Sequence, residues 1–347
     1  MPRREPGVAS APTIHDVARL AEVSIKTVSN VLNDYPHIRP ATKTRVLDAI
    51  VALDYKPNLA ARGLRSGRTG LISLIIPDLR NDYFAELADA VMRAADPHGL
   101  SIIISQSGAD RDRELDLLRG PRMQMVDGIL FSALALGEQD NDLLAGVAKP
   151  MVLLGERILH GPRDHVTMRN TEAVKAATEH LLQQGRRRIV ALGADAAQGP
   201  GSAALRLDGY RQAMAEAGLT VDEDLVVEVV GWYRSTGAAA MRAFLQRDLP
   251  FDGVVAFNDT IALGAMRVMQ EAGLRIPQDV ALIGFDDVDE TRYSLPTLST
   301  IDPGRVEIAE VALRYLRQRI ESPGADLPPQ DHLTTFAVVE RESSRPT

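Results

Sequence analysis

The 347-residue chain contains no cysteine and a single tryptophan, and aromatic residues make up only 4% of it. Without cysteine there is no disulfide framework, thiolate metal site or thiol nucleophile, which fits a cytoplasmic protein. No apolar run reaches the roughly 18 residues that a membrane helix requires. The histidines are scattered, and the closest pair, His160 and His165, is expected in a loop. We therefore expect no membrane span, no metal site and no cofactor.

Sequence motifs of common enzyme classes are also missing. There is no GxxxxGK[ST] phosphate loop and no GxSxG nucleophile elbow, and the GPG at 199–201 lacks the third glycine of a dinucleotide fingerprint. The acidic run DDVDE at 286–290 is interpreted as a solvated strand-end loop. Residues 1–12 have no apolar segment and are expected to form a disordered basic arm, not a signal peptide. An α/β enzyme and a secreted solute-binding protein remain the weaker alternatives.

Charge is divided unevenly along the chain. Residues 1–68 hold 11 Lys and Arg against 6 Asp and Glu, a net charge of +5, whereas the remainder carries −13 of the total of −8. A basic N-terminal part attached to an acidic remainder predicts that only the N-terminal part faces a polyanion such as nucleic acid.

The first 53 residues predict a helix-turn-helix followed by a third helix. Thr13 is a candidate N-cap for the first helix, the turn lies at 22–23, and Ser24 is a candidate N-cap for a second helix ending near Asn33. The third helix is expected over about 41–53. Apolar residues at helical spacing supply the expected three-helix core: Ile14, Val17, Ala18, Ala21, Val28, Val31, Leu32, Val46, Ile50 and Leu53.

The second of these helices carries a different face whose chemistry suits a DNA major groove. Lys26 can donate to guanine, Asn30 can pair with adenine, and Ile25 can lie against a thymine methyl group. Hydroxyl side chains suit phosphate oxygens, which position a helix without reading sequence: Thr13, Thr27 and Ser29. An ordinary solvated helix face is the alternative, and the surrounding pattern favours DNA contact.

A short fourth helix is expected at 58–65, after Pro57. Eight residues rich in alanine and glycine are too few to form a stable helix alone in water, and the following RSGRTG (65–70) can act as a flexible tether. Leu64 has no obvious core to join. Two such helices in a dimer could insert paired leucines into a minor groove and kink the DNA.

Together these residues resemble a known family. The segments TIHDVARLAEVSIKTVSNVLN (13–33) and YKPNLAARGL (55–64) strongly resemble the head of the lactose/purine repressor family of bacterial transcription regulators. The resemblance implies that the side chains of Ile25, Lys26 and Asn30 read bases. It also implies that Leu64 intercalates with Ala61 beside it in the minor groove, and we include Asn58 in this contact segment.

After Gly70 the pattern changes to short apolar runs alternating with helical stretches. Such runs predict two doubly wound α/β subdomains with parallel sheets. The runs lie at 71–77, 100–106, 127–133, 150–156, 187–195, 224–232, 252–259 and 279–287, with a last strand in TTFAVVERES (334–343) and a helix at about 305–320. The expected domains are the helix-turn-helix (13–56), hinge helix and linker (57–69), an N-subdomain (70–169 plus 302–331) and a C-subdomain (170–301 plus 332–347).

Ligands in such sheets bind beyond the carboxyl ends of the strands. This part, notably RIPQDVALIGFDD (275–287), again resembles the same repressor family, whose core is similar to periplasmic sugar-binding proteins. The resemblance implies an effector site formed by Tyr83, Phe84, Ser202, Arg206, Trp232, Asn258 and Asp286. An aromatic wall with a few aimed polar groups favours a sugar-like, hydroxyl-rich ligand. Arg169 stands where the family usually has aspartate, which offers a phosphorylated or carboxylated ligand as the alternative.

The sequence therefore predicts a cytoplasmic, ligand-responsive transcription regulator, most simply a repressor. One recognition helix reads only one half-site, so the protein is expected to bind a palindromic operator in double-stranded DNA as a homodimer. The effector itself, and whether it induces or corepresses, does not follow from the sequence.

Overall fold

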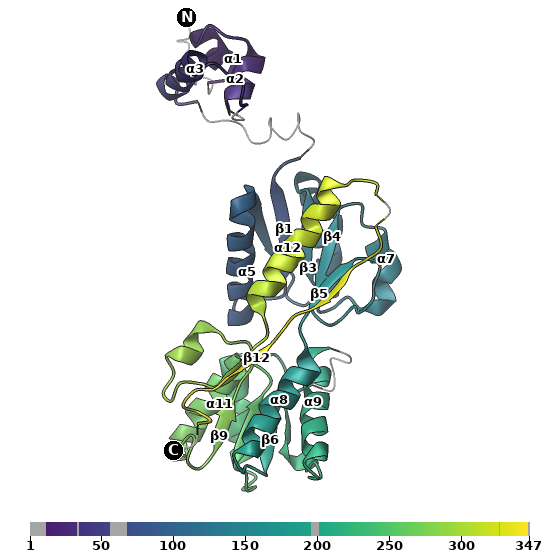
Figure 1. Ribbon diagram of the computed structural model, residues 1–347. Helices are drawn as coiled ribbons and strands as arrows, with labels where there is room; N and C mark the ends of the chain where they lie inside the picture. Colours follow the sequence, from purple (N-terminus) through teal and green to yellow (C-terminus); the bar gives the residue numbers. More distant parts are fainter. Residues whose placement is uncertain (1–11, 33–34, 56–67, 196–200, 326, 346–347) are drawn as a thin grey trace, which may run out of the picture. The chain divides into compact units, whose positions relative to one another are not determined.

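The computed structural model describes residues 12–32, 35–55, 68–195, 201–325 and 327–345 (Figure 1). It divides into two compact units, Met1–Thr69 and Gly70–Thr347, which we call the head and the body. Asn58, Ala61 and Leu64, predicted to enter the minor groove, lie outside the described residues. Among the described residues, no helix is long and apolar enough to cross a membrane.

The head contains the predicted three helices. They are α1 (Ile14–Leu20), α2 (Ile25–Leu32) and α3 (Pro40–Ala52). Their shared core is made of small apolar side chains, namely Val17, Ala18, Ala21, Val28, Val31, Val46 and Ala49. Ile14, Leu32, Ile50 and Leu53 are only partly buried and pack against this core. The predicted helix-turn-helix is confirmed, and its core consists of valine and alanine side chains.

Polar side chains fix where the first two helices begin. The Thr13 backbone N–H and hydroxyl both donate to Oδ2 of Asp16, at 2.9 and 2.7 Å. Ser24 Oγ accepts the N–H of Thr27 at 3.1 Å. Both arrangements use a side chain three residues away to pair a polar group at a helix start, as predicted from the N-cap residues.

The body contains two parallel sheets with helices around them (Figure 1). The first sheet has the strand order β11-β5-β4-β3-β1-β2 and the second has the order β7-β6-β8-β9. A separate antiparallel pair joins β10 to β12. The two predicted parallel sheets are confirmed. The strands of the first sheet are β1 (Leu71–Ile76), β2 (Ser101–Gln106), β3 (Gly128–Ser132), β4 (Met151–Leu154), β5 (Asp164–Thr167) and β11 (Asp331–Leu333).

The remaining strands and the helices follow in chain order. The other strands are β6 (Ile189–Ala194), β7 (Val226–Glu228), β8 (Gly253–Ala256), β9 (Ala281–Ile283), β10 (Thr300–Asp302) and β12 (Ala337–Val339). The helices are α5 (Asp82–Ala95), α6 (Arg111–Arg119), α7 (Asn141–Ala145), α8 (Asn170–Gln183), α9 (Ser202–Glu216), α10 (Arg234–Leu245), α11 (Asp259–Glu271) and α12 (Arg305–Glu321).

Helix pairs in the second half of the body pack at very short range. A Cβ added to Gly209 of α9 would lie 2.2 Å from the carbonyl oxygen of Thr171 in α8. A Cβ added to Gly264 of α11 would lie 2.0 Å from the carbonyl oxygen of Arg234 in α10. Only glycine permits these approaches. The two helices of each pair are therefore packed closely together beside the second sheet.

The chain passes between the two sheets at three places. After β5 it enters α8, after β10 it enters α12, and after β11 it returns to β12. The sequence did not predict β5, β10 or β11 as separate strands. The expectation that His165 lies in a loop is also wrong, because His165 is a buried residue of β5.

Candidate functional site

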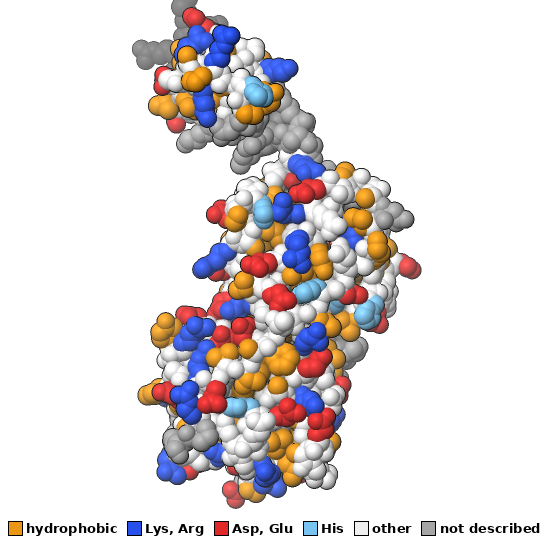
Figure 2. Space-filling model, viewed as in Figure 1, with side chains coloured by type: hydrophobic (Ala, Val, Ile, Leu, Met, Phe, Trp, Pro, Cys, Tyr) orange, Lys and Arg blue, Asp and Glu red, His pale blue; other side chains and the backbone are white. Residues whose placement is uncertain are grey.

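The head presents the predicted DNA-reading side chains at its surface. Thr13 and Lys26 are exposed, while Ile25, Thr27, Ser29 and Asn30 are partly exposed, and Val28 and Val31 of the same helix are buried. Helix α2 therefore has one face in the core and another toward solvent. The visible face of the head in Figure 2 shows several basic side chains, with a few acidic ones among apolar and neutral groups, and the basic side chains suit a phosphate backbone.

A cavity of about 280 Å³ lies between the two sheets of the body. Side chains from both sheets line it, beyond the carboxyl ends of β1, β4, β8 and β9. All seven residues predicted for the effector site are among its lining residues: Tyr83, Phe84, Ser202, Arg206, Trp232, Asn258 and Asp286. A more open groove of about 800 Å³ between α5 and α12 contains none of them.

Arg206 is the buried cation of this cavity, with 3% of its surface exposed. Its Nε donates to Oδ1 of Asn170 at 2.7 Å, and Nη1 donates to the carbonyl of Phe257. Its guanidinium carbon lies 3.6 Å from the ring centroid of Phe285 and 5.1 Å from that of Trp232. Burial lowers the pKa of Arg206, but a guanidinium remains charged in proteins. The site therefore offers a fixed positive group sandwiched by aromatic rings.

Asp286 faces this cation from the end of β9. Its backbone adopts φ 118°, which is costly for a residue with a side chain. Asp286 is 4% exposed and lines the cavity. Burial raises the pKa of Asp286 well above its usual range, and the facing Arg206 lowers it. Asp286 therefore contributes a buried carboxyl group to the cavity lining.

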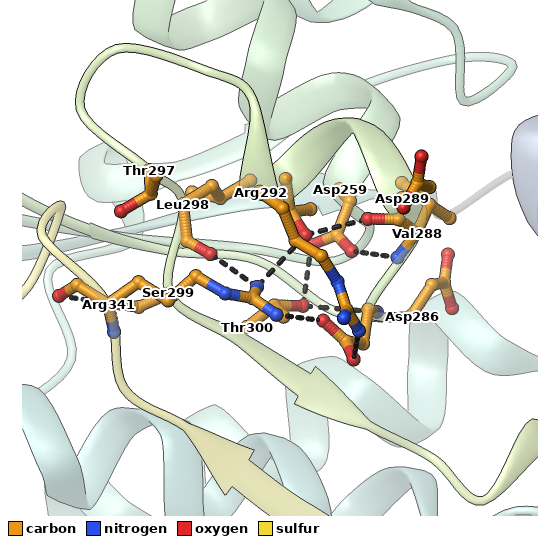
Figure 3. Close-up of polar contacts among 12 residues, drawn as sticks. Asp259, Asp286, Val288, Asp289, Arg292, Thr297, Leu298, Ser299, Thr300 and Arg341 are labelled. Atoms are coloured by element: carbon orange, nitrogen blue, oxygen red, sulfur yellow. Dashed lines mark hydrogen bonds and ion pairs between the residues drawn. The ribbon is translucent and has the colours of Figure 1, made fainter.

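Neighbouring side chains hold the strained turn that carries Asp286 (Figure 3). Asp259, fully buried, accepts from the N–H of Val288 at 3.1 Å and from the hydroxyl of Thr300 at 2.6 Å. Asp287 accepts from Arg341 at 2.5 Å. The prediction that 286–290 is a solvated loop is thus wrong for its first three residues, which are buried. These contacts fix the backbone of the turn and do not involve the side chain of Asp286.

One end of α12 reinforces the same turn. Arg305 donates from Nη1 to the carbonyl of Asp286 at 2.7 Å and forms an ion pair with Glu86 of α5 at 2.5 Å. Glu86 in turn accepts from the N–H of Asp289 at 2.8 Å. The backbone carbonyl of Asp286 is therefore connected to α5 and α12, which pack against the first sheet.

Asn258 and Thr167 add polar atoms to the lining that lack partners. Oδ1 of Asn258 caps α11 by accepting the N–H of Ile261 at 2.8 Å. Among the described residues, Nδ2 of Asn258 and Oγ1 of Thr167 are buried without any hydrogen-bond partner. Buried polar groups normally find one. The cavity therefore offers a donor amide and a hydroxyl in addition to the Asp286 carboxyl group.

Aromatic side chains form the walls. Trp232 donates from Nε1 to the carbonyl of Gly193 at 3.2 Å and packs edge-on against Phe257. In α5, on the side of the first sheet, the rings of Tyr83 and Phe84 are 5.2 Å apart in a T-shaped arrangement. Burial, followed by the charge of Asp286, raises the pKa of Tyr83 far above its usual range, so its hydroxyl stays protonated. These rings lie on both sides of the polar groups that line the cavity.

The structure adds Glu156, which the sequence analysis missed. It lies two residues after β4, is 8% exposed, and accepts from Nδ2 of Asn170 at 2.8 Å and from the hydroxyl of Ser202 at 2.7 Å. Its position after a buried strand was the signal that could have revealed it. Arg169, considered as a partner for an anionic ligand, lies outside the cavity lining and approaches Glu172 at 3.5 Å.

Comparisons with known proteins agree with both parts of the chain. Residues 13–58 match the model of bacterial regulatory proteins of the lacI family, and residues 178–344 match a periplasmic binding protein-like domain. The chain is 32% identical over 340 residues to the HTH-type transcriptional regulator RegA of Clostridium saccharobutylicum, covering 96% of this chain and 99% of RegA.

Solved structures give the same result. A putative transcriptional regulator of the LacI family from Sanguibacter keddieii is 47% identical, with a TM-score of 0.74 over 80% of this chain and 99% of that one. The transcriptional regulator CelR, solved as a cellobiose complex, is 29% identical, with a TM-score of 0.70 over 96% of this chain and 100% of that one.

Proposed function

Because the chain belongs to the lacI family of bacterial transcription regulators, we propose that it is a cytoplasmic repressor that binds a palindromic operator as a homodimer. A small hydroxyl-rich molecule, most simply a sugar, binds in the cavity and sets the DNA affinity. The two functions reside in different units of the chain, α2 in the head and the 280 Å³ cavity in the body.

The DNA-binding role is assigned to the exposed face of α2. Lys26 and Asn30 read base edges in the major groove, and Ile25 contacts a thymine methyl group. Thr13, Thr27 and Ser29 contact phosphates. One such helix covers one half-site, so a second copy is needed for a palindrome. The segment containing Asn58, Ala61 and Leu64 is proposed to enter the minor groove between the half-sites.

The ligand class follows from the unpaired groups of the cavity. Among the described residues, the amide Nδ2 of Asn258 and the hydroxyl Oγ1 of Thr167 are buried without a partner in a cavity that the buried Asp286 also lines, and this observation carries the proposal. A pair of hydroxyl groups satisfies a carboxylate acceptor and an amide donor together. Among the described lining residues, Arg206 is the one buried cation, and the acidic side chains of Asp286 and Glu156 act on it, so an anionic ligand would meet more acidic than basic groups. The cellobiose bound by CelR is a ligand of the proposed kind.

A binding screen with the full-length protein tests this assignment. The panel contains neutral mono- and disaccharides, sugar phosphates and nucleobases, and thermal unfolding is the readout, because a ligand that binds only the folded state raises the melting temperature. Asp286→Ala should abolish the shift that a neutral sugar produces. Asp208→Ala, at an exposed site on α9, is the matched control and should preserve it.

Operator binding in a gel-shift assay completes the test. A sugar that shifts the melting temperature should also change the operator affinity of the wild-type protein, and operator should change the sugar affinity by the same factor. A response to sugar phosphates that exceeds the response to neutral sugars would overturn the ligand class. Equal sugar affinity with and without operator would overturn the regulatory coupling.

A further inference from the structure

Three lining residues mark where the cavity meets solvent. The side chain of Arg80 is 77% exposed although Arg80 lines the cavity, and Tyr233 beside it is partly exposed. Asp78, also a lining residue, is 8% exposed and lies just beneath them. We call Asp78, Arg80 and Tyr233 the rim cluster. Its residues come from opposite sides, since Asp78 and Arg80 follow β1 of the first sheet and Tyr233 precedes α10 beside the second sheet.

The rim cluster is closed by strong contacts. The Tyr233 hydroxyl donates to Oδ2 of Asp78 at 2.6 Å. Arg80 forms an ion pair with the same oxygen at 2.7 Å, and its guanidinium carbon lies 5.1 Å from the centroid of the Tyr233 ring. A hydrogen bond to an ionised acceptor is about twice as strong as a neutral one. The two sides of the cavity are thus joined at its edge by one phenol clamped between a carboxylate and a guanidinium.

The next residue of the chain adds a second link across the same edge. Arg234 forms an ion pair with Asp82 of α5 at 2.6 Å and with Glu290 at 3.0 Å. The preceding residue, Trp232, is a wall of the cavity. Three consecutive residues therefore act at this edge. Trp232 lines the cavity, Tyr233 closes its rim, and Arg234 adds an ion pair to α5 on the side of the first sheet.

We infer that Tyr233 is a specificity-determining residue that restricts the cavity to compact, single-ring ligands. This inference rests on the proposed function and names the size class of its effector. The cavity volume of about 280 Å³ is at the lower limit of small-molecule sites. A ligand that continues past the rim must break the hydrogen bond between Tyr233 and Asp78 and displace Arg80. A single ring enclosed behind the rim breaks neither contact.

The only tryptophan of the chain makes this gate measurable without the effector. Trp232 lies in the cavity next to Tyr233, so collisional quenching of its fluorescence reports which solutes pass the rim. Two quenchers of different size serve as probes on the full-length, unliganded protein, namely acrylamide, which is small and neutral, and the bulkier neutral nitroxide TEMPO. The informative quantity is the TEMPO quenching constant divided by the acrylamide constant.

The variants isolate one hydrogen bond. Tyr233→Phe removes the donor to Asp78 and keeps the ring, and loss of a hydrogen bond to a charged group favours the open state about tenfold. The ratio of quenching constants should therefore rise several-fold. Tyr293→Phe is the matched control, because its side chain is 80% exposed, and it should leave the ratio at the wild-type value. Asp78→Asn removes the charge that both Tyr233 and Arg80 contact, so it should raise the ratio at least as much as Tyr233→Phe does.

The outcomes separate this inference from the proposed function. A low ratio in the wild type that rises in Tyr233→Phe supports the gate, whatever the sugar screen shows. A wild-type ratio equal to that of Tyr233→Phe overturns the gate, even if a sugar binds. When a neutral sugar is found, the gate further requires that wild type prefers it over its disaccharides and that Tyr233→Phe reduces this preference. An unchanged preference overturns the size selection.

Discussion

The head and the body place functional side chains in opposite environments. In the head, Lys26 and Asn30 lie on an outer face of α2 while valines of the same helix fill the core. In the body, Arg206 and Asp286 are both buried, and neighbouring groups fix their backbone or side chains. The difference predicts that recognition can be changed in the head without affecting stability, whereas recognition and stability are coupled in the body.

The largest expected effect tests this coupling in the body. Arg206→Met leaves the carboxyl groups of Asp286 and Glu156 without the guanidinium that faces them, and breaking such a buried charge cluster costs about 3–5 kcal/mol. Urea unfolding of the full-length protein measures the loss. The control Arg93→Met removes an exposed ion pair with Asp89 and should cost about 1 kcal/mol or less. Equal losses in the two variants would contradict the contrast.

A slightly smaller effect concerns pH. Burial raises the pKa of Asp259 to about 7. Because the folded-state pKa lies above the unfolded value, the protonated carboxyl is favoured by folding, and this stability is present below about pH 4 and lost as pH rises through about 7. The difference amounts to as much as about 4 kcal/mol. Asp259→Asn should therefore flatten the decline of unfolding free energy over this interval. A decline as steep as in the wild type would show that Asp259 does not titrate there.

The head should behave in the opposite way. Lys26→Ala should reduce discrimination at one base position per half-site by about 1–3 kcal/mol, while the free energy of unfolding changes by less than about 0.5 kcal/mol. Thr13→Ala, a change at a predicted phosphate contact, should instead weaken all sequences alike. Selection of binding sites from a random library distinguishes the two. Recovery of the wild-type consensus with Lys26→Ala would show that Lys26 reads no base.

The smallest effect concerns the rim cluster in acid. The hydrogen bond from Arg80, together with that from Tyr233, lowers the pKa of Asp78 to about 2. Its contribution is therefore present above about pH 4 and is lost only as pH falls through about 2. The TEMPO-to-acrylamide ratio for Trp232 should stay constant from neutral pH down to about pH 4. A rise in that ratio near neutral pH would mean that another group controls the rim.

The sequence was most informative where periodicity was long. The main apolar runs became strands, and the three head helices begin and end within a residue or two of the predicted positions. Strand β5 escaped prediction because it reads DHVT, and its buried first residue is paired with Arg319, 155 positions away, and with the N–H of Gln330. Strands β10 and β11 have three residues each, too few for a pattern.

For the candidate site too, the sequence indicated residues at the ends of predicted strands but not the contacts between distant segments. The family resemblance implied Asn258 and Asp286, and both lie at strand ends, where parallel strands bring their carboxyl ends to one edge. The contact between Asp78 and Tyr233 joins positions 155 apart and has no local signature. Glu156 looks like an ordinary loop residue until Ser202, 46 positions later, is brought against it.

The three passages between the sheets also fix the order in which the molecule becomes complete during synthesis. The head's core needs nothing beyond its own 69 residues. The first sheet waits for α12 and β11, and the turn that carries Asp286 waits for Arg341. In a nascent chain the head can therefore fold long before the body is complete. Most of translation passes before the head and the cavity of the body can influence each other. Arrest of synthesis after the head would release a DNA-binding unit that lacks the cavity and that no effector could regulate.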